Sequence, residues 1–161
     1  RAIFSSGYSH RLLEDVKYFC VHHSAADRDS TPEEIDQLHR NKGWPSIGYH
    51  DMVLFDGTLI LVGDLDTQRA CVTAMNDLAH CIELNGLFID GRRPTEAQVR
   101  TLAFRWRQLE GEEGYGHALD LVGHKDIAPA SDPTRCPGDE WHLWKVEIED
   151  AYRELSAVRI A

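Results

Sequence analysis

Short strand-like runs that alternate with well-marked helix starts are the feature that most constrains how this chain folds. Residues 16–22, VKYFCVH, form a nearly continuous apolar run that is typical of a buried strand. Residues 48–63 predict two strands joined at an Asp56-Gly57 turn, the strongest short-range hairpin signal. Further strands are expected at residues 80–85 and 119–124. Because one pair is a hairpin while the others alternate with helices, the sheet should be mixed.

Three helices are predicted between and after these strands. The first opens with Thr31 as N-cap, Pro32 at the first helical position and Glu34 completing a capping box, and Gly43 ends it. Residues 95–110 and 139–155 carry apolar residues at helical spacing and predict the other two. The expected fold class is α/β, with a central mixed sheet flanked by helices.

The size and charge of the chain limit its organisation and its partners. With 161 residues and no repeat or linker, we expect one domain over residues 1–161, with residues 1–15 as a peripheral extension. The net charge of −10 argues against a nucleic-acid partner and against adhesion to an anionic membrane. The chain should therefore recognise its partner through a shaped site, and we expect a monomer.

The four cysteines are too few and too scattered to predict a disulfide scaffold. We therefore expect a reducing compartment, or cysteines with core or metal roles. No apolar run is long enough to span a membrane, and no signal-peptide pattern opens the sequence. Since Arg1 stands where Met is usual, a processed chain or an excised module is also expected, and export stays open.

Two segments together predict a metal site. The pair His22-His23 ends the first strand, and His124 ends a later one, followed by a proline-rich loop that contains Cys136. Each segment alone is more often structural than metal-binding. Two imidazoles and one thiolate, however, would give zinc three protein ligands and leave one position for water, as in catalytic sites. His23 and Asp132 are further ligand candidates from the same segments.

Five ordered segments carry a family resemblance over residues 16–145. They are FCVHHSAA, LHRNKGWPSIGYH, FDGTLILVGDLDT, NDLAHCIELNG and GHKDIAPASDPTRCPG. In order and spacing they resemble the zinc-dependent N-acetylmuramoyl-L-alanine amidases, a group that includes phage lysozyme-type amidases, wall-recycling amidases and animal peptidoglycan-recognition proteins. The resemblance implies that the chain hydrolyses the amide bond between N-acetylmuramic acid and the L-alanine of the stem peptide, with bacterial peptidoglycan as substrate.

The resemblance also implies roles for individual residues. His22, His124 and Cys136 match the family's Zn²⁺ ligands, while Tyr49 and Thr134 match residues that face the reacting carbonyl. From the residues alone, Tyr49 would be an ordinary strand aromatic. The substrate cleft is expected to be lined by His23, Trp44, Cys71 and Asp132.

Glu83 matches a catalytic glutamate of the wall-recycling branch. It lies between Ile82 and Leu84 inside a predicted strand, where an unpaired carboxylate is costly, and this independently favours a functional role. We expect it to act as general base on a zinc-activated water, with Tyr49 and Thr134 donating to the oxyanion.

The sequence departs from the family pattern at three places. Cys71 replaces a cleft-lining histidine, and Ala79-His80-Cys81 replaces the usual Ser-Ile-Gly, so the packing there should differ. The loop between His124 and Cys136 is longer than in phage-type relatives, and Asp132 within it is a rival third ligand.

Two other functions remain open from the sequence. One is a non-catalytic peptidoglycan-recognition module, against which the presence of all three ligand residues speaks. The other is a cysteine peptidase using Cys20 or Cys71, although Cys20 lies in a buried-strand pattern. For an endolysin we expect residence in the host cytoplasm before release to the cell wall. A secreted or periplasmic location is expected if a signal segment was removed.

Overall fold

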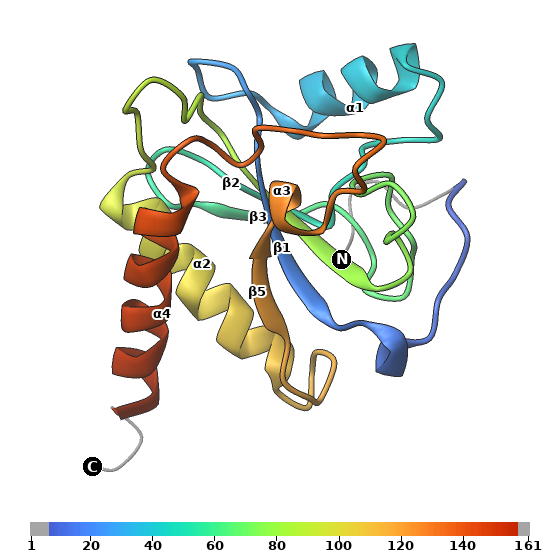
Figure 1. Cartoon of the computed structure of the whole chain (residues 1–161). Coiled ribbons are helices and arrows are strands. Elements are labelled where there is room, and N and C mark those ends of the chain that lie inside the picture. Colours follow the sequence, from blue (N-terminus) through green and yellow to red (C-terminus); the bar gives the residue numbers. More distant parts are fainter. Residues whose placement is uncertain (1–6, 158–161) are drawn as a thin grey trace.

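The computed structural model describes residues 7–157, which form a five-stranded sheet with helices on both faces (Figure 1). The strands are β1 (Tyr18–His23), β2 (Asp51–Val53), β3 (Leu59–Leu61), β4 (Ala79–Leu84) and β5 (Asp120–Gly123). The α-helices are α1 (Pro32–Asn41), α2 (Glu96–Glu110), α3 (His124–Ile127) and α4 (Trp141–Ala157), and a short 3₁₀ turn spans Leu13–Asp15. The predicted α/β class is confirmed.

The sheet is mixed, as the hairpin signal predicted. Its strand order is β3-β2-β4-β1-β5, with β2 and β3 antiparallel and every other neighbouring pair parallel. Gly57 adopts a φ of 86°, the left-handed conformation that the predicted Asp56-Gly57 turn needs. The two hairpin strands are shorter than the predicted range of residues 48–63.

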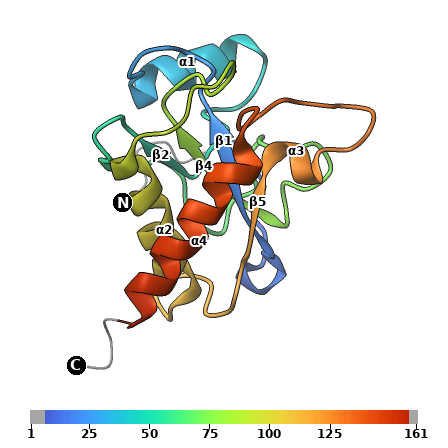
Figure 2. The same cartoon turned by 60° about the vertical axis from the view of Figure 1, so that its left-hand side comes forward.

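The two sheet faces are covered differently. Helices α2 and α4 pack together over one face, where they enclose the largest apolar core, including Phe19, Ile82 and Trp144 (Figure 2). The opposite face carries two smaller clusters, one around Cys20 and Cys81 and one beneath α1. Since side chains alternate along a strand, neighbouring residues of β1 and β4 belong to different environments.

Local signals define the helix ends. The Thr31 hydroxyl accepts the Glu34 N–H, and the Glu34 carboxylate accepts the Thr31 N–H at 2.8 Å, so the predicted capping box is present. Helix α2 starts with an equivalent box between Thr95 and Gln98.

The cysteine prediction was wrong in one respect. Cys71 and Cys81 form a disulfide, whereas Cys20 and Cys136 are buried free thiols. Cys81 lies on β4 and Cys71 in the loop before it, so the bond closes a local loop. Scattered spacing argued against a scaffold of several bridges but did not exclude this single bridge.

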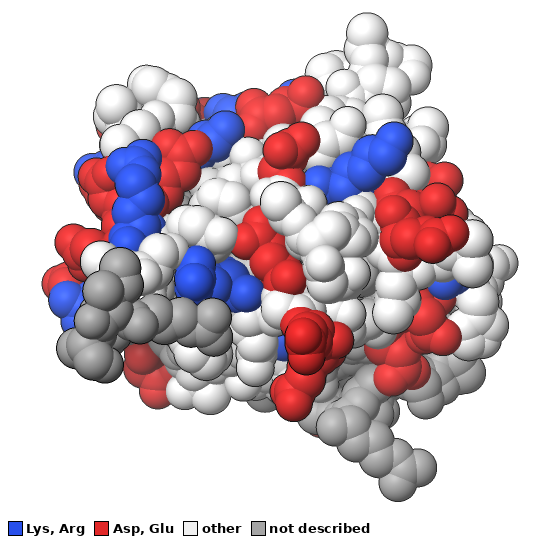
Figure 3. Space-filling view, turned by 90° about the horizontal axis from the view of Figure 1, so that it is seen from below, with Lys and Arg blue, Asp and Glu red and all other residues white. Residues whose placement is uncertain are grey.

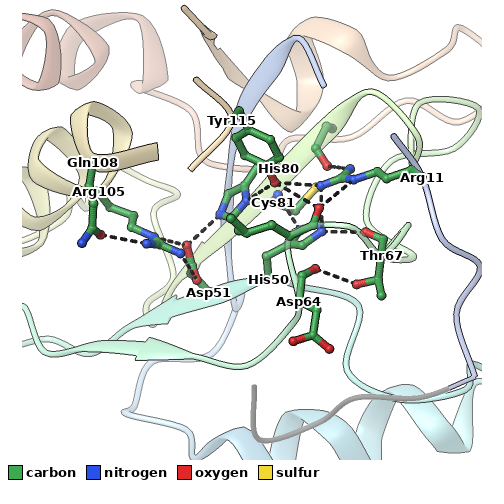
Figure 4. Close-up of polar contacts among 12 residues, drawn as sticks. Arg11, His50, Asp51, Asp64, Thr67, His80, Cys81, Arg105, Gln108 and Tyr115 are labelled. Atoms are coloured by element: carbon green, nitrogen blue, oxygen red, sulfur yellow. Dashed lines mark hydrogen bonds and ion pairs between the residues drawn. The ribbon is translucent and has the colours of Figure 1, made fainter. Parts of the chain in front are cut away.

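A buried polar network joins the sheet to α2 beside the largest apolar core (Figure 4). Asp51 accepts two hydrogen bonds from the Arg105 guanidinium at 2.7 and 3.1 Å, and its carboxylate lies 2.7 Å from His80 Nε2. The ring of His80 stacks on that of His50. Burial raises the pKa of Asp51, but His80 and Arg105 outweigh it and lower that pKa overall.

Arg11 extends this network from the N-terminal segment. Its guanidinium donates to the carbonyl of Ala79 at 2.6 Å and to the Tyr115 hydroxyl at 2.9 Å, and the residue is only 8% exposed. The described part of the predicted peripheral extension, residues 7–15, is therefore anchored to the sheet through Arg11. Residues 1–6 of that prediction lie outside the described residues.

Acidic side chains are spread over the face seen in Figure 3, with basic side chains interspersed among them. Within residues 7–157, none of the helices has the length and apolar composition needed to cross a membrane.

Candidate active site

The predicted site residues gather where three parallel strands end. His22 lies near the carboxyl end of β1, Glu83 near that of β4, and His124 directly follows β5. Ligands of α/β proteins commonly bind outside the carboxyl ends of parallel strands. In the parallel register His22 pairs with Glu83, so both side chains point to the same face of the sheet, away from α2 and α4.

The structure brings His22, His124 and Cys136 together. One ligand atom from each lies within 4.8 Å of the others, and the rings of the two histidines are 4.6 Å apart. Cys136 Sγ lies 3.6 Å from His22 Nδ1. Two nitrogens and one sulfur at this separation are a donor set that suits zinc better than magnesium or calcium.

The loop that supplies Cys136 is fastened to helix α3, which begins with His124. Lys125 donates its backbone N–H to the Cys136 carbonyl at 2.8 Å and its ammonium group to the Gly138 carbonyl at 2.5 Å. Asp126 accepts hydrogen bonds from the Gly123 N–H and from the indole of Trp141. These contacts hold the two ligand-bearing segments in one place before any metal binds.

Burial keeps the three donors uncharged in the absence of a cation. It lowers the pKa of His22 well below its usual range, and it also lowers that of His124. It raises the pKa of the Cys136 thiol to about 12, although the backbone N–H of His23, 3.4 Å from the sulfur, opposes the rise. Neutral imidazoles are ready ligands, whereas the thiol must lose its proton when a metal binds.

Glu83 is fully buried, and neither carboxylate oxygen has a hydrogen-bond partner among residues 7–157. Burial raises its pKa to about 8. The nearby Ser24 hydroxyl partly opposes that rise in pKa. In the structure this hydroxyl donates its hydrogen bond to the Gly86 carbonyl, at 3.3 Å, and not to Glu83. The charge of Glu83 in turn raises the pKa values of Tyr49 and Cys136, which places all three in one electrostatic environment.

Tyr49 and Thr134 border this environment. The Tyr49 ring lies 5.2 Å from that of His22, and burial raises the pKa of its hydroxyl well above the usual value. The Thr134 hydroxyl accepts the Cys136 N–H at 3.1 Å. Thr134 thus shapes the turn that carries the cysteine.

The four residues predicted to line the cleft have different surroundings. His23 is half-buried, and its Nδ1 accepts the Phe88 N–H at 3.3 Å, while Trp44 packs on His39, whose ring lies 5.3 Å from Tyr49. Asp132 is exposed, accepts a hydrogen bond from Thr73 and does not join the cluster with His22. Cys71 is bonded to Cys81 and is not a free thiol in the cleft.

Sequence reasoning missed two contributors near the site. Cys20 Sγ lies 3.4 Å from His22 Nε2, and the strand alternation that puts positions 20 and 22 on one face was the available signal. Asp126 braces the loop, and only its position three residues after Gly123, as in a helix-start motif, pointed to it.

Comparison with known proteins agrees with this geometry. Residues 12–139 match the family model described as N-acetylmuramoyl-L-alanine amidase. The chain is 30% identical over 136 residues to an endolysin of Klebsiella phage KP32, covering 81% of this chain and 86% of the relative.

Solved structures extend the comparison. The Ph2119 endolysin from a Thermus scotoductus bacteriophage superposes with a TM-score of 0.75 and 28% identity, covering 92% of each chain. Drosophila PGRP-LB, at 24% identity and a TM-score of 0.70, shares the fold over 86% of this chain and 85% of that one. The family model spans most of the chain and includes all three converging donors, and the chain belongs to the N-acetylmuramoyl-L-alanine amidase family.

Proposed function

We propose that this chain is a zinc-dependent peptidoglycan amidase of the phage endolysin type, with His22, His124 and Cys136 as the metal ligands. The observation that carries the proposal is the convergence of these three donors beside a buried carboxyl group without a partner. The bond cleaved is the amide between N-acetylmuramic acid and the L-alanine of the stem peptide. Zinc bound there supplies Lewis-acid chemistry, because it polarises the scissile carbonyl and makes a water molecule acidic near neutral pH.

Glu83 is proposed to move the proton. A group with a raised pKa can take a proton from the attacking water and return it to the departing amine nitrogen. Its carboxylate is free for this task, since no protein donor holds either oxygen among the described residues. A cation bound to the neighbouring ligands would favour the charged form of Glu83, the form that accepts the proton.

Tyr49 and Thr134 are proposed to stabilise the transition state. A hydroxyl with a raised pKa keeps its proton and can donate it to the developing oxyanion, and Tyr49 meets this condition. Removal of one preorganised donor of this kind typically costs about 3 kcal/mol in activation free energy. His23, Trp44 and Asp132 remain proposed substrate contacts, while Cys71 supports the cleft only through its disulfide.

The biological setting is proposed from the relatives that carry the name endolysin. The enzyme would stay in the host cytoplasm until it is released to the cell wall, and it would act as a monomer on peptidoglycan.

The deciding experiment is the mass of the products formed from defined muropeptides. We expect a free stem peptide that begins at L-alanine, lost when a chelator removes the metal and regained when zinc is restored. An unchanged muropeptide under every condition, with one zinc tightly bound, would instead identify a recognition module. Activity that survives the chelator but is lost on thiol alkylation would favour a cysteine peptidase.

A further inference from the structure

A second group of metal-ligating atoms lies directly beside the first and shares one residue with it. Ligand atoms of Cys20, His22 and Cys81 lie within 4.8 Å of one another, and all three residues are buried. The two ring nitrogens of His22 face different sulfur atoms. Nδ1 lies 3.6 Å from Cys136 Sγ, and Nε2 lies 3.4 Å from Cys20 Sγ.

The disulfide decides which group can bind a metal. While Cys81 is bonded to Cys71, its sulfur is not available as a thiolate, and the second group offers only one free thiol besides His22. His22, His124 and Cys136 are then the complete set. Once the disulfide is reduced, Cys81 becomes a thiol beside Cys20, its register partner on β1, and Cys71 is released within reach.

We propose that reduction of the Cys71–Cys81 disulfide creates a second, non-catalytic zinc site on Cys20, Cys81 and His22, which competes with the amidase site for His22. Cys20, Cys81 and His22 supply three ligands, and Cys71, once released, can supply the fourth, which would close the site as in structural zinc sites. Thiolates are also the softer ligands that zinc favours. Because a neutral imidazole binds metal through one nitrogen and carries a proton on the other, zinc bound at Nε2 would leave Nδ1 protonated and unable to serve the catalytic set.

The chemistry balances with a thiol or phosphine reductant. A dithiol supplies two electrons and two protons, so the bond between the two sulfur atoms breaks, Cys71 and Cys81 become thiols, and the dithiol becomes a disulfide. A phosphine supplies the two electrons, water supplies the two protons, and the water oxygen passes to phosphorus to give a phosphine oxide. Zinc then replaces the thiol protons of Cys20 and Cys81, which pass to solvent.

The consequence rests on the proposed function. An amidase made in a reducing cytoplasm would hold its metal in the non-catalytic site. Outside the cytoplasm, a disulfide oxidant would take two electrons from the sulfur atoms of Cys71 and Cys81 and, with two protons, become two thiols. The Cys71–Cys81 bond would then re-form, zinc would leave Cys81, and His22 would return to the catalytic set. The disulfide would then act as a switch that routes the metal.

The test is cobalt binding to the Cys136→Ser variant, which lacks the thiolate of the catalytic set. We expect no sulfur-to-cobalt charge-transfer band in the oxidised variant and a clear band after reduction with a phosphine that does not bind the metal. The band should be lost in Cys136→Ser/Cys20→Ser. Absence of the band on reduction, or an undiminished band without Cys20, would overturn the proposal.

Two further variants guard against a fold that does not survive reduction. Cys71→Ser leaves Cys81 free without any reductant, so Cys136→Ser/Cys71→Ser should show the band directly, and its absence counts against the site. Cys71→Ser/Cys81→Ser removes the disulfide and also the second site.

With one equivalent of zinc, wild-type protein should lose most of its amidase activity when the reductant is added. Cys71→Ser/Cys81→Ser has no disulfide to reduce, so its activity, at whatever level, should be the same with and without the reductant. An equal fold loss in both proteins would show that the reductant acts elsewhere and would overturn the proposal. The expected cobalt spectra in a protein inactive in every form would instead contradict the proposed function and leave the second site standing.

Discussion

Two pairs of histidine rings lie on opposite faces of the same sheet, each with centroids 4.6 Å apart, and their surroundings differ completely. His50 and His80 are stacked, and protein groups engage both ring nitrogens of each: His80 lies between Asp51 and Tyr115, and His50 between Cys81 and Thr67. The rings of His22 and His124 are tilted by 52°, and the two ring nitrogens of His22 lie near the sulfur atoms of Cys20 and Cys136.

The carboxyl groups beside the two pairs differ in the same way. Asp51 is matched by Arg105 and His80, whereas neither oxygen of Glu83 has a partner among residues 7–157. The other buried polar atoms without a partner in that range belong to Asn85 and Trp144, which are neutral. A buried cluster in which every polar group has a hydrogen-bond partner stabilises the fold. A buried cluster in which an ionisable group has no such partner indicates a binding or catalytic site.

The largest effect is expected from Glu83→Gln, which keeps the shape of the side chain and removes its charge. Turnover should fall by about 10²–10⁴-fold, the usual contribution of a general acid–base group. Zinc stoichiometry should stay at the wild-type value, because Glu83 is not a ligand. Near-full turnover with zinc bound would remove Glu83 from the mechanism.

The matched change on the opposite face is Asp51→Asn, which should affect stability rather than chemistry. It leaves the buried Arg105 guanidinium without its counter-charge, and breaking such a pair costs about 3–5 kcal/mol of unfolding free energy. Urea denaturation measures this loss, and zinc binding below the transition is the control. A loss below about 1 kcal/mol would mean that the Asp51–Arg105 pair contributes no more to stability than an exposed salt bridge does, despite its burial.

A third prediction concerns the pH dependence of the metal-free protein. Glu83 keeps its proton in the folded state up to about pH 8, whereas the unfolded chain releases it near pH 4.5. Between these values the folded state binds more protons, so the Glu83 contribution to unfolding free energy falls as pH rises. Each pKa unit corresponds to about 1.4 kcal/mol, so the loss amounts to several kcal/mol at most.

The buried histidines act in the opposite direction, because the unfolded chain protonates them at low pH while the folded state keeps them neutral. The difference between wild type and Glu83→Gln at each pH isolates the carboxyl contribution. That difference should change across the window from about pH 4.5 to about pH 8. A constant difference would mean that Glu83 is already ionised in the folded protein.

The two faces also differ in how far the sequence predicted them. The capping box at Thr31 and the turn at Gly57 depend on residues within four positions, and both were found as predicted. The convergence of His22, His124 and Cys136 was predicted from two segments rich in metal-ligating residues, and the family resemblance then supported the same three ligands. The polar network could not be predicted, because Arg11 and Tyr115 are 104 residues apart and no local pattern pairs them.

The disulfide was also beyond prediction from local sequence, although its two cysteines are much closer in the chain than Arg11 and Tyr115. Cys71 and Cys81 are ten residues apart, but spacing alone does not reveal that strand β4 turns one sulfur toward the other. The expectation of cysteines without a disulfide was wrong for this pair, whereas the other two cysteines are free thiols. A disulfide between two cysteines that only the tertiary structure brings together cannot be predicted until the fold is known.

The smallest effect is expected from Thr134→Val, which tests the hydrogen bond between the Thr134 hydroxyl and the Cys136 backbone. The change removes the acceptor of the Cys136 N–H, so the turn that carries the sulfur should lose precision. Loss of such a supporting contact lowers metal affinity by about 10–100-fold, measured by competition with a chromophoric chelator. Thr134→Ser keeps the hydroxyl and should bind zinc like the wild type. If instead zinc affinity is unchanged and turnover falls, the Thr134 hydroxyl acts on the substrate, as the family resemblance implies. Only a contact to the reacting carbonyl would affect the reaction without affecting metal binding.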